Sequence, residues 1–168
     1  ADLGLTGGDL RAGERTFQLL DQVAGRAGRA DRPGRVILQT YMPEHAVMRA
    51  LAAGDRDRFV AAEMEARAEA GYPPFGRLAS LVLSGPDEAA LGVFARELAR
   101  TAPRDGEVHT LGPAPAPIAL LRGRHRVRFL VRARGASSLH AALVRWLAPV
   151  RVPSAIRLAV DVDPQSFL

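Results

Sequence analysis

The sequence predicts two kinds of fold in one chain, an α/β arrangement in its first part and an α+β arrangement in its second part. In the first part, helical periodicity surrounds one short, largely apolar β-branched run that is plausible as a buried parallel strand. In the second part, strands and helices alternate along the chain. The Tyr-Pro-Pro-Phe-Gly sequence at residues 72–76 cannot be helical and indicates a stiff joint. We therefore expect two domains, at residues 1–76 and 77–168.

The first domain is expected to contain three helices and a strand. Apolar side chains at helical spacing predict a helix at residues 12–24. The largely apolar, β-branched run at residues 35–41 is typical of a buried parallel strand. Further helices are predicted at residues 43–54 and 55–71, each ended by a glycine, and Asp55 caps the second of these.

The second domain is expected to contain four strands and two helices. Pro86 at a first helical position begins one helix, and Ser137 or Ser138 caps the other. The strands are predicted at residues 78–84, 108–111, 124–134 and 156–162, and the helices at residues 86–98 and 137–147. The proline-rich segment 112–117 favours an extended conformation with few hydrogen bonds. This βαββαβ order is that of a ferredoxin-like fold, in which two helices cover one face of an antiparallel sheet.

The long strand at residues 124–134 carries a concentrated positive charge. From residue 122 to residue 134 every even position except 130 is arginine. Because strand side chains alternate between faces, Val127, Phe129 and Val131 are expected to be buried, with the guanidinium groups on the opposite face. Such a row can neutralise the phosphates of a nucleic acid. The candidate DNA-binding residues are Arg122, Arg124, Arg126, Arg128, Arg132 and Arg134.

Two other interpretations of this row stay open, a solvated outer face and an edge strand protected by charge. Nucleic-acid contact is favoured because no acidic residue interrupts the row and the formal net charge of the chain is +5. Tyr72 and Phe75 either pack at the joint or stack on bases, and the neighbouring prolines favour packing. Asp161 and Asp163 lie on the outer face of the last strand, where we expect them to pair with arginines.

The octet Gln-Val-Ala-Gly-Arg-Ala-Gly-Arg at residues 22–29 begins in the last turn of the helix predicted at residues 12–24. Gly25 and Gly28 allow a tight turn and a close approach to a ligand, so that Arg26 and Arg29 could contact one anion. The alternative is a glycine-capped helix end, at which the arginines interact with the helix dipole. All 23 basic residues are arginine, so the chain cannot contain a P-loop, which requires a lysine.

This octet resembles motif VI of superfamily 2 helicases, and the chain as a whole resembles the PriA (primosomal protein N′) family of replication restart helicases. The similarity covers essentially the whole chain in the order found in that family. The matching segments are residues 1–5, 11–20, 22–29, 36–41, 43–45, 71–78, 111–118 and 160–166.

The resemblance implies that residues 1–76 are the C-terminal end of the second RecA-like helicase lobe. It implies that residues 77–168 form a DNA-binding domain similar to ribosomal protein S10. Arg26 and Arg29 would then act as arginine fingers on the γ-phosphate, with Gln22 beside them. Gly25 and Gly28 would lie close to the nucleotide.

The intact protein is expected to use ATP and Mg²⁺ for 3′-to-5′ unwinding at stalled replication forks, and to hold zinc in an upstream module. This chain alone is expected to hold no cofactor and to be inactive as an enzyme, since it has no lysine and no cysteine. The implied partners are branched and single-stranded DNA, single-strand DNA-binding protein and other primosome proteins. The implied location is the bacterial cytoplasm at the nucleoid, and no apolar stretch is long enough to span a membrane.

Two alternatives to a working helicase stay open. The chain could belong to a protein whose motor has decayed and which binds forks and recruits primosome proteins. It could also be an RNA-binding protein of the S10 type, although the helicase-like first third speaks against this. The four histidines have no metal-ligand spacing, so we expect no metal site.

Overall fold

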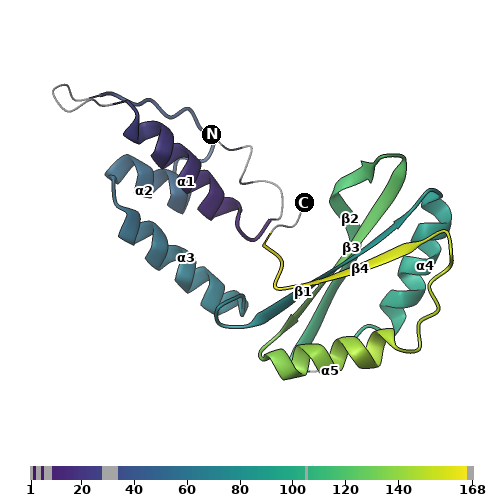
Figure 1. Cartoon of the computed structure of the whole chain (residues 1–168). Coiled ribbons are helices and arrows are strands. Elements are labelled where there is room, and N and C mark those ends of the chain that lie inside the picture. The colour runs from purple at the N-terminus through teal and green to yellow at the C-terminus, as the bar shows by residue number, and fades with distance from the viewer. Residues whose placement is uncertain (1, 3–4, 6–8, 28–33, 105, 166–168) are drawn as a thin grey trace. The chain divides into compact units, whose positions relative to one another are not determined.

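The computed structural model describes residues 2, 5, 9–27, 34–104 and 106–165 (Figure 1). The chain divides into two compact units, Ala1–Ala66 and Arg67–Leu168. The described residues form five helices and four strands, and all four strands belong to one antiparallel sheet in the second unit. The described structure is therefore of the α+β class.

The first unit is helical where the structure describes it. It contains α1 (Ala12–Gly25), α2 (Ala46–Ala53) and the beginning of α3 (Arg56–Ala70). Its buried core consists of Phe17, Val47, Met48, Ala50 and Phe59. The rings of Phe17 and Phe59 stack with their centroids 4.4 Å apart. As predicted, Asp55 caps α3, because its carboxylate accepts a 2.9 Å hydrogen bond from the Arg58 N–H.

The prediction of a buried strand at residues 35–41 is wrong for this chain. The segment has no strand partner among the described residues, and Ile37 and Tyr41 are 80% and 96% exposed. Its end is held by Asp2, whose carboxylate accepts hydrogen bonds from the Thr40 hydroxyl and, at 2.7 Å, from the Tyr41 N–H. These hydrogen bonds, that of Thr40 first, lower the pKa of Asp2. A β-branched run becomes a strand only where neighbouring strands satisfy its backbone N–H and C=O groups.

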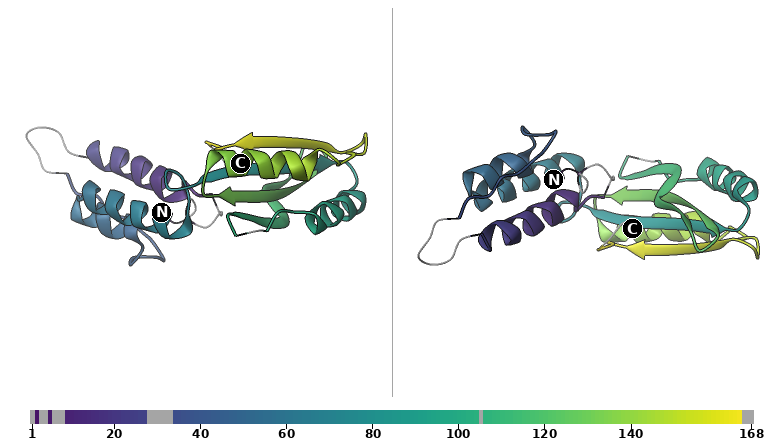
Figure 2. Two further views of the ribbon diagram at one scale, coloured as in Figure 1. Left: turned by 90° about the horizontal axis from the view of Figure 1, so that it is seen from below. Right: turned by 90° about the horizontal axis from the view of Figure 1, so that it is seen from above.

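The second unit has the predicted βαββαβ order. Its elements are β1 (Arg77–Gly85), α4 (Glu88–Arg100), β2 (Val108–Leu121), β3 (Arg124–Ala133), α5 (Ala136–Leu147) and β4 (Arg157–Val162). The strand order in the sheet is β2-β3-β1-β4, and every neighbouring pair is antiparallel (Figures 1 and 2). The two hairpin strands β2 and β3 are joined by a turn at Arg122 and Gly123, where φ is 50° and 72°. A two-residue hairpin turn requires such positive φ values.

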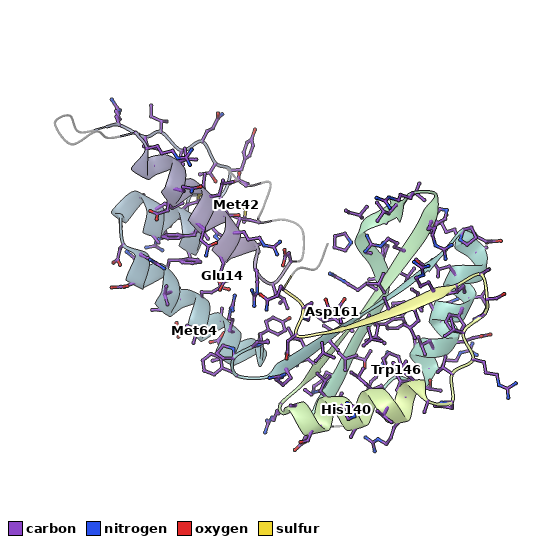
Figure 3. All side chains as sticks on the ribbon, in the orientation of Figure 1. Glu14, Met42, Met64, His140, Trp146 and Asp161 are labelled. Carbon is purple, nitrogen blue, oxygen red and sulfur yellow. The ribbon has the colours of Figure 1, made fainter. Side chains whose placement is uncertain are left out.

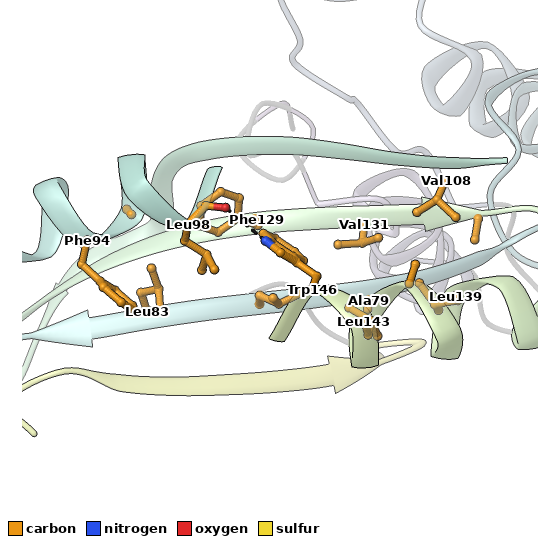
Figure 4. Close-up of a cluster of buried hydrophobic side chains, with 14 of the residues drawn as sticks. Ala79, Leu83, Phe94, Leu98, Val108, Phe129, Val131, Leu139, Leu143 and Trp146 are labelled. Atoms are coloured by element: carbon orange, nitrogen blue, oxygen red, sulfur yellow. Dashed lines mark hydrogen bonds between the residues drawn. The ribbon is translucent and has the colours of Figure 1, made fainter. Parts of the chain in front are cut away.

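One face of this sheet packs against α4 and α5 to form the main hydrophobic core (Figure 4). Phe129 of β3 meets Trp146 of α5 edge to face, with the ring centroids 5.6 Å apart. The buried Trp146 indole N–H donates a 3.1 Å hydrogen bond to the Leu98 carbonyl of α4. The two helices are therefore linked to each other as well as to the sheet.

The ends of several elements differ from the sequence-based expectation. Pro86, predicted at the first helical position, precedes the helix: Asp87 is the N-cap of α4, and its carboxylate accepts a 3.0 Å hydrogen bond from the Ala90 N–H. Helix α5 begins after Gly135 without a side-chain cap, so neither Ser137 nor Ser138 has that role. Ser138 instead donates a 2.9 Å hydrogen bond to the Glu107 carboxylate.

The proline-rich segment is part of β2, which continues beyond the predicted strand end to Leu121. Its pairing with β3 is irregular, with register shifts between Leu111 and Ala114 and between Pro115 and Leu120. Prolines lack an N–H donor, so they interrupt the ladder of hydrogen bonds without ending the extended conformation. The prediction of extended backbone is confirmed, whereas the prediction of a short strand is wrong.

Candidate nucleic-acid interface

The alternation predicted for β3 is present in the structure. Phe129, Val131 and Ala133 are buried in the core, and Val127 packs against it. The even-numbered residues therefore lie on the sheet face opposite α4 and α5. We call this surface the arginine face. Its arginines are Arg122, Arg124, Arg126, Arg128, Arg132 and, from β4, Arg157.

The register of the central strands arranges this face in rows. Each row consists of a β1 residue flanked by its β3 and β4 partners. The rows are Ser84 between Arg126 and Arg157, Val82 between Arg128 and Ala159, and Ser80 between Leu130 and Asp161. Among these three rows, the arginines occupy the Ser84 and Val82 rows and the carboxylate of Asp161 occupies the Ser80 row, beyond which Arg132 pairs with Leu78.

Sequence reasoning missed Arg157. It is exposed at the start of β4 and lies across Ser84 from Arg126. Alternation along residues 156–162 could have placed it outside the core, because Ile156 is buried and Leu158 packs against the same core. Only the sheet register shows that it joins the arginines of β3.

Several guanidinium groups already contact backbone carbonyls, which no sequence pattern reveals. Arg124 donates hydrogen bonds to the Ser84 carbonyl at 2.8 Å and to the Ala155 carbonyl at 3.0 Å. Arg126 donates to the Ile118 carbonyl at 3.4 Å, and Arg132 donates to the Ala70 carbonyl near the end of α3. A guanidinium carries five N–H donors in a fixed plane, so these contacts orient it and leave donors for a phosphate.

A depression of about 440 Å³ lies on the arginine face. Its lining residues come from all four strands and from the β2–β3 turn. They are Ser80, Val82, Ser84, Leu121, Arg122, Arg124, Arg126, Arg157, Ala159, Val160 and Asp161. As predicted, Asp161 is on the non-core side of β4 (Figure 3). Asp163, beyond the strand end, pairs with Arg77, as expected of an acid beside arginines.

A second depression, of about 340 Å³, lies near the other end of β3. Arg132 and Arg134 line it together with Phe75 and His109. Phe75 is 48% exposed, and Arg134 follows the end of β3 as an exposed side chain. The second unit thus presents Arg124 and Arg126 near one end of β3 and Arg132 and Arg134 near the other.

The predicted nucleotide-handling residues are only partly described. Gln22, Gly25 and Arg26 are exposed at the C-terminal end of α1, whereas Gly28 and Arg29 lie outside the described residues. A Cβ at Gly25 would meet no atom within 4 Å, so packing in this unit does not require glycine there. The Arg26 N–H donates to the Val23 carbonyl at 3.2 Å, which ends the helix.

Neither a metal-ligand cluster nor a membrane span is found in the part of the chain that the structure describes. No three histidine or acidic side chains there are grouped as metal ligands. No helix there is long and apolar enough to cross a bilayer.

A family model and individual known proteins both match this chain, and they point to the same family. The model of the family described as primosomal protein N C-terminal domain matches residues 68–165. A replication restart protein PriA from Rickettsia conorii is 46% identical over 167 residues, which are 99% of this chain and 26% of that protein. The PriA protein of Bacillus subtilis is 34% identical over 173 residues, 100% of this chain and 22% of that protein.

A PriA protein of Synechocystis is 36% identical over 179 residues, with 99% of this chain and 20% of that protein covered. The chain thus spans about a quarter of the length of the curated relatives it matches. The family match includes every strand of the arginine face and both helices behind it. The chain therefore belongs to the PriA family, in which it corresponds to the C-terminal region.

Proposed function

We propose that the second unit is a DNA-binding domain and that the arginine face is its binding surface. The main observation in support of this proposal is that six arginines lie on one face of a sheet whose other face is covered by α4 and α5. Lysine and arginine contacts to phosphates supply most of the affinity of such surfaces and little of their sequence preference.

The fold supports this use of the surface. The arginine face is extended, and Arg124, Arg126 and Arg128 of β3 recur at every second residue, or about 6.8 Å along the strand. Hydrogen bonds from Arg124, Arg126 and Arg132 to backbone carbonyls hold their side chains in place before DNA arrives. Preordered side chains lose less conformational entropy on binding.

We further propose that the first unit is the end of a RecA-like helicase lobe, in which Arg26 and Arg29 act as arginine fingers. Gln22 and Arg26 are exposed at one helix end, and nothing packs where Gly25 lacks a Cβ. The described residues offer guanidinium groups and no lysine-containing phosphate loop. ATP and Mg²⁺ would thus be held mainly by the remainder of a longer protein, and zinc by a cysteine-containing module outside this cysteine-free chain.

In this proposal the longer protein is an ATP-dependent 3′-to-5′ DNA helicase acting in replication restart. Its partners are branched and single-stranded DNA, single-strand DNA-binding protein and other primosome proteins. It works at the nucleoid in the bacterial cytoplasm. The second unit is the S10-like, ferredoxin-like part of that protein and positions it on branched DNA.

The proposal is tested by measuring DNA binding across a salt series. The double variant Arg126→Ala, Arg128→Ala should bind a labelled fork more weakly, and the slope of log K against log salt should fall by about two units. The matched control is Arg96→Ala, Arg100→Ala, which removes the same charge from exposed positions of α4. Equal slopes in wild type and both variants would show that the arginine face is only a solvated surface.

A further inference from the structure

The depression on the arginine face differs from a flat phosphate-binding surface. Its volume of about 440 Å³ lies within the range of roughly 300–1,000 Å³ that small-molecule sites occupy. Four arginines, Arg122, Arg124, Arg126 and Arg157, line it together with two serines and the acid Asp161. On a surface that bound only duplex phosphates a carboxylate would weaken binding, because its negative charge repels phosphates.

The charges are separated along the strands. Arg126 and Arg157 flank Ser84, and Asp161 lies opposite Ser80, four residues further along β1. At about 3.4 Å per residue, the distance along β1 from Ser84 to Ser80 is about 14 Å. An anion is therefore favoured at the Ser84 end, and a hydrogen-bond donor is favoured at the Ser80 end.

The middle of the depression is small and apolar. Val82 and Ala159 are partners across β1 and β4 and lie between the two charged ends. Neither side chain is large, and Ser80 and Ser84 are short as well. The exposed Leu121 of β2 adds an apolar surface beside Arg124, at the arginine end of the depression. Such a floor can receive the flat apolar face of a base, which a base pair inside a duplex does not expose.

We propose that this depression holds one unpaired nucleotide of a DNA strand, with its phosphate among the arginines and its base directed at Asp161. The inference rests on the proposed DNA-binding function and adds a ligand and an orientation to it. An ionised aspartate only accepts hydrogen bonds, so where it faces the 4-position of a pyrimidine it favours an amino group there over a carbonyl oxygen. Cytosine offers such a donor at N4, whereas thymine presents the acceptor O4 at the same place.

The test compares the binding of oligo(dC) and oligo(dT) of equal length to the full chain at fixed salt and a pH near 8. We expect wild type to bind oligo(dC) about fivefold more tightly, the lower end of the discrimination given by a good base contact. Asp161→Asn should abolish this preference, because an amide can donate to O4 as readily as it accepts from N4. Asp161 is exposed, so the variant is expected to fold.

The control variant is Glu97→Gln, which makes the same charge change at an exposed position on α4 and should keep the preference. Arg157→Ala should weaken the binding of both oligonucleotides without changing their ratio. A blunt duplex should be bound equally by wild type and Asp161→Asn, apart from the charge effect that Glu97→Gln also shows.

Two results overturn the inference while leaving the proposed function intact. Wild type could bind oligo(dC) and oligo(dT) equally, or Asp161→Asn could tighten the binding of both to the same extent. In either case the depression is part of a general phosphate surface, provided that the Arg126→Ala, Arg128→Ala variant still lowers the salt slope. If that variant also behaves as wild type, the DNA-binding function itself is wrong.

Discussion

At the scale of the residue, Gly112 is required by its neighbours in the second unit. Its φ is 107°, and a Cβ at this position would lie 2.7 Å from the Arg128 carbonyl oxygen and 3.2 Å from the Phe129 Cα. Both obstacles are backbone atoms of β3, which cannot rotate away as a side-chain end can. The close approach of β2 to the strand that carries the arginines therefore depends on glycine.

We expect Gly112→Ala to lower the free energy of unfolding by about 2 kcal/mol or more, from backbone strain together with the steric clash. Urea denaturation followed by circular dichroism measures this change. The control is Gly106→Ala, since a Cβ there meets no atom within 4 Å and φ is not in the left-handed range. Equal stability of the two variants would show that β2 can shift away from β3 at no cost.

At the scale of the element, β3 combines two roles by means of its alternation. Its odd residues build the core with α4 and α5, while its even residues form the arginine face. Arg124 connects these roles, because its guanidinium bonds to the carbonyls of Ser84 in β1 and Ala155 before β4. It therefore joins three parts of the sheet region in addition to facing the depression.

We expect Arg124→Ala to lower the free energy of unfolding by about 1–3 kcal/mol, because hydrogen bonds from a charged donor to two carbonyls are lost. Arg122→Ala, in the exposed turn, should leave stability unchanged within about 0.5 kcal/mol. Chemical denaturation of both variants checks this difference. If Arg124→Ala has the same free energy of unfolding as wild type but a lower salt slope for DNA binding, then Arg124 contributes to phosphate binding and not to stability.

At the scale of the whole molecule, the chain is about a quarter of the length of its curated relatives. The described part of the first unit has the Arg26 guanidinium at the end of α1, and the second unit has the arginine face. Arginine fingers stabilise charge on a transferring phosphoryl group and need a nucleotide held by other groups. The first unit is therefore expected to show its function only within the longer protein.

We expect Arg26→Ala in the longer protein to reduce DNA-stimulated ATP hydrolysis by roughly 10³-fold, as removal of an arginine finger does elsewhere. Binding to forked DNA should change little. Steady-state ATPase assays and fork-binding assays on the same preparations make the comparison, with the present chain as a negative control for hydrolysis. Normal ATPase activity of the variant would show that Arg26 is not an arginine finger and only ends the helix.

Local periodicity was sufficient to predict much of the second unit. The alternation of Val127, Phe129 and Val131 with arginines indicated which side of β3 is buried, because adjacent strand residues always point to opposite faces. The βαββαβ order followed from the same kind of local pattern, and the similarity to the PriA family was visible in the residues themselves. These features depend on residues close together in the sequence, so no knowledge of tertiary contacts is needed.

The tertiary structure alone decided which distant groups meet. Strand register placed Arg157 across Ser84 from Arg126 and Asp161 across Ser80 from Leu130, and it placed carbonyls within reach of Arg124. The segment 35–41 has the composition of a strand, yet it forms none, because a strand must pair with a neighbour and the described residues of the first unit contain no other strand. The sequence by itself determined the two faces of each strand and helix, because side-chain direction is a local property of the backbone. Which residues face each other across the sheet depends on strand order and register, and these are determined only in the folded tertiary structure.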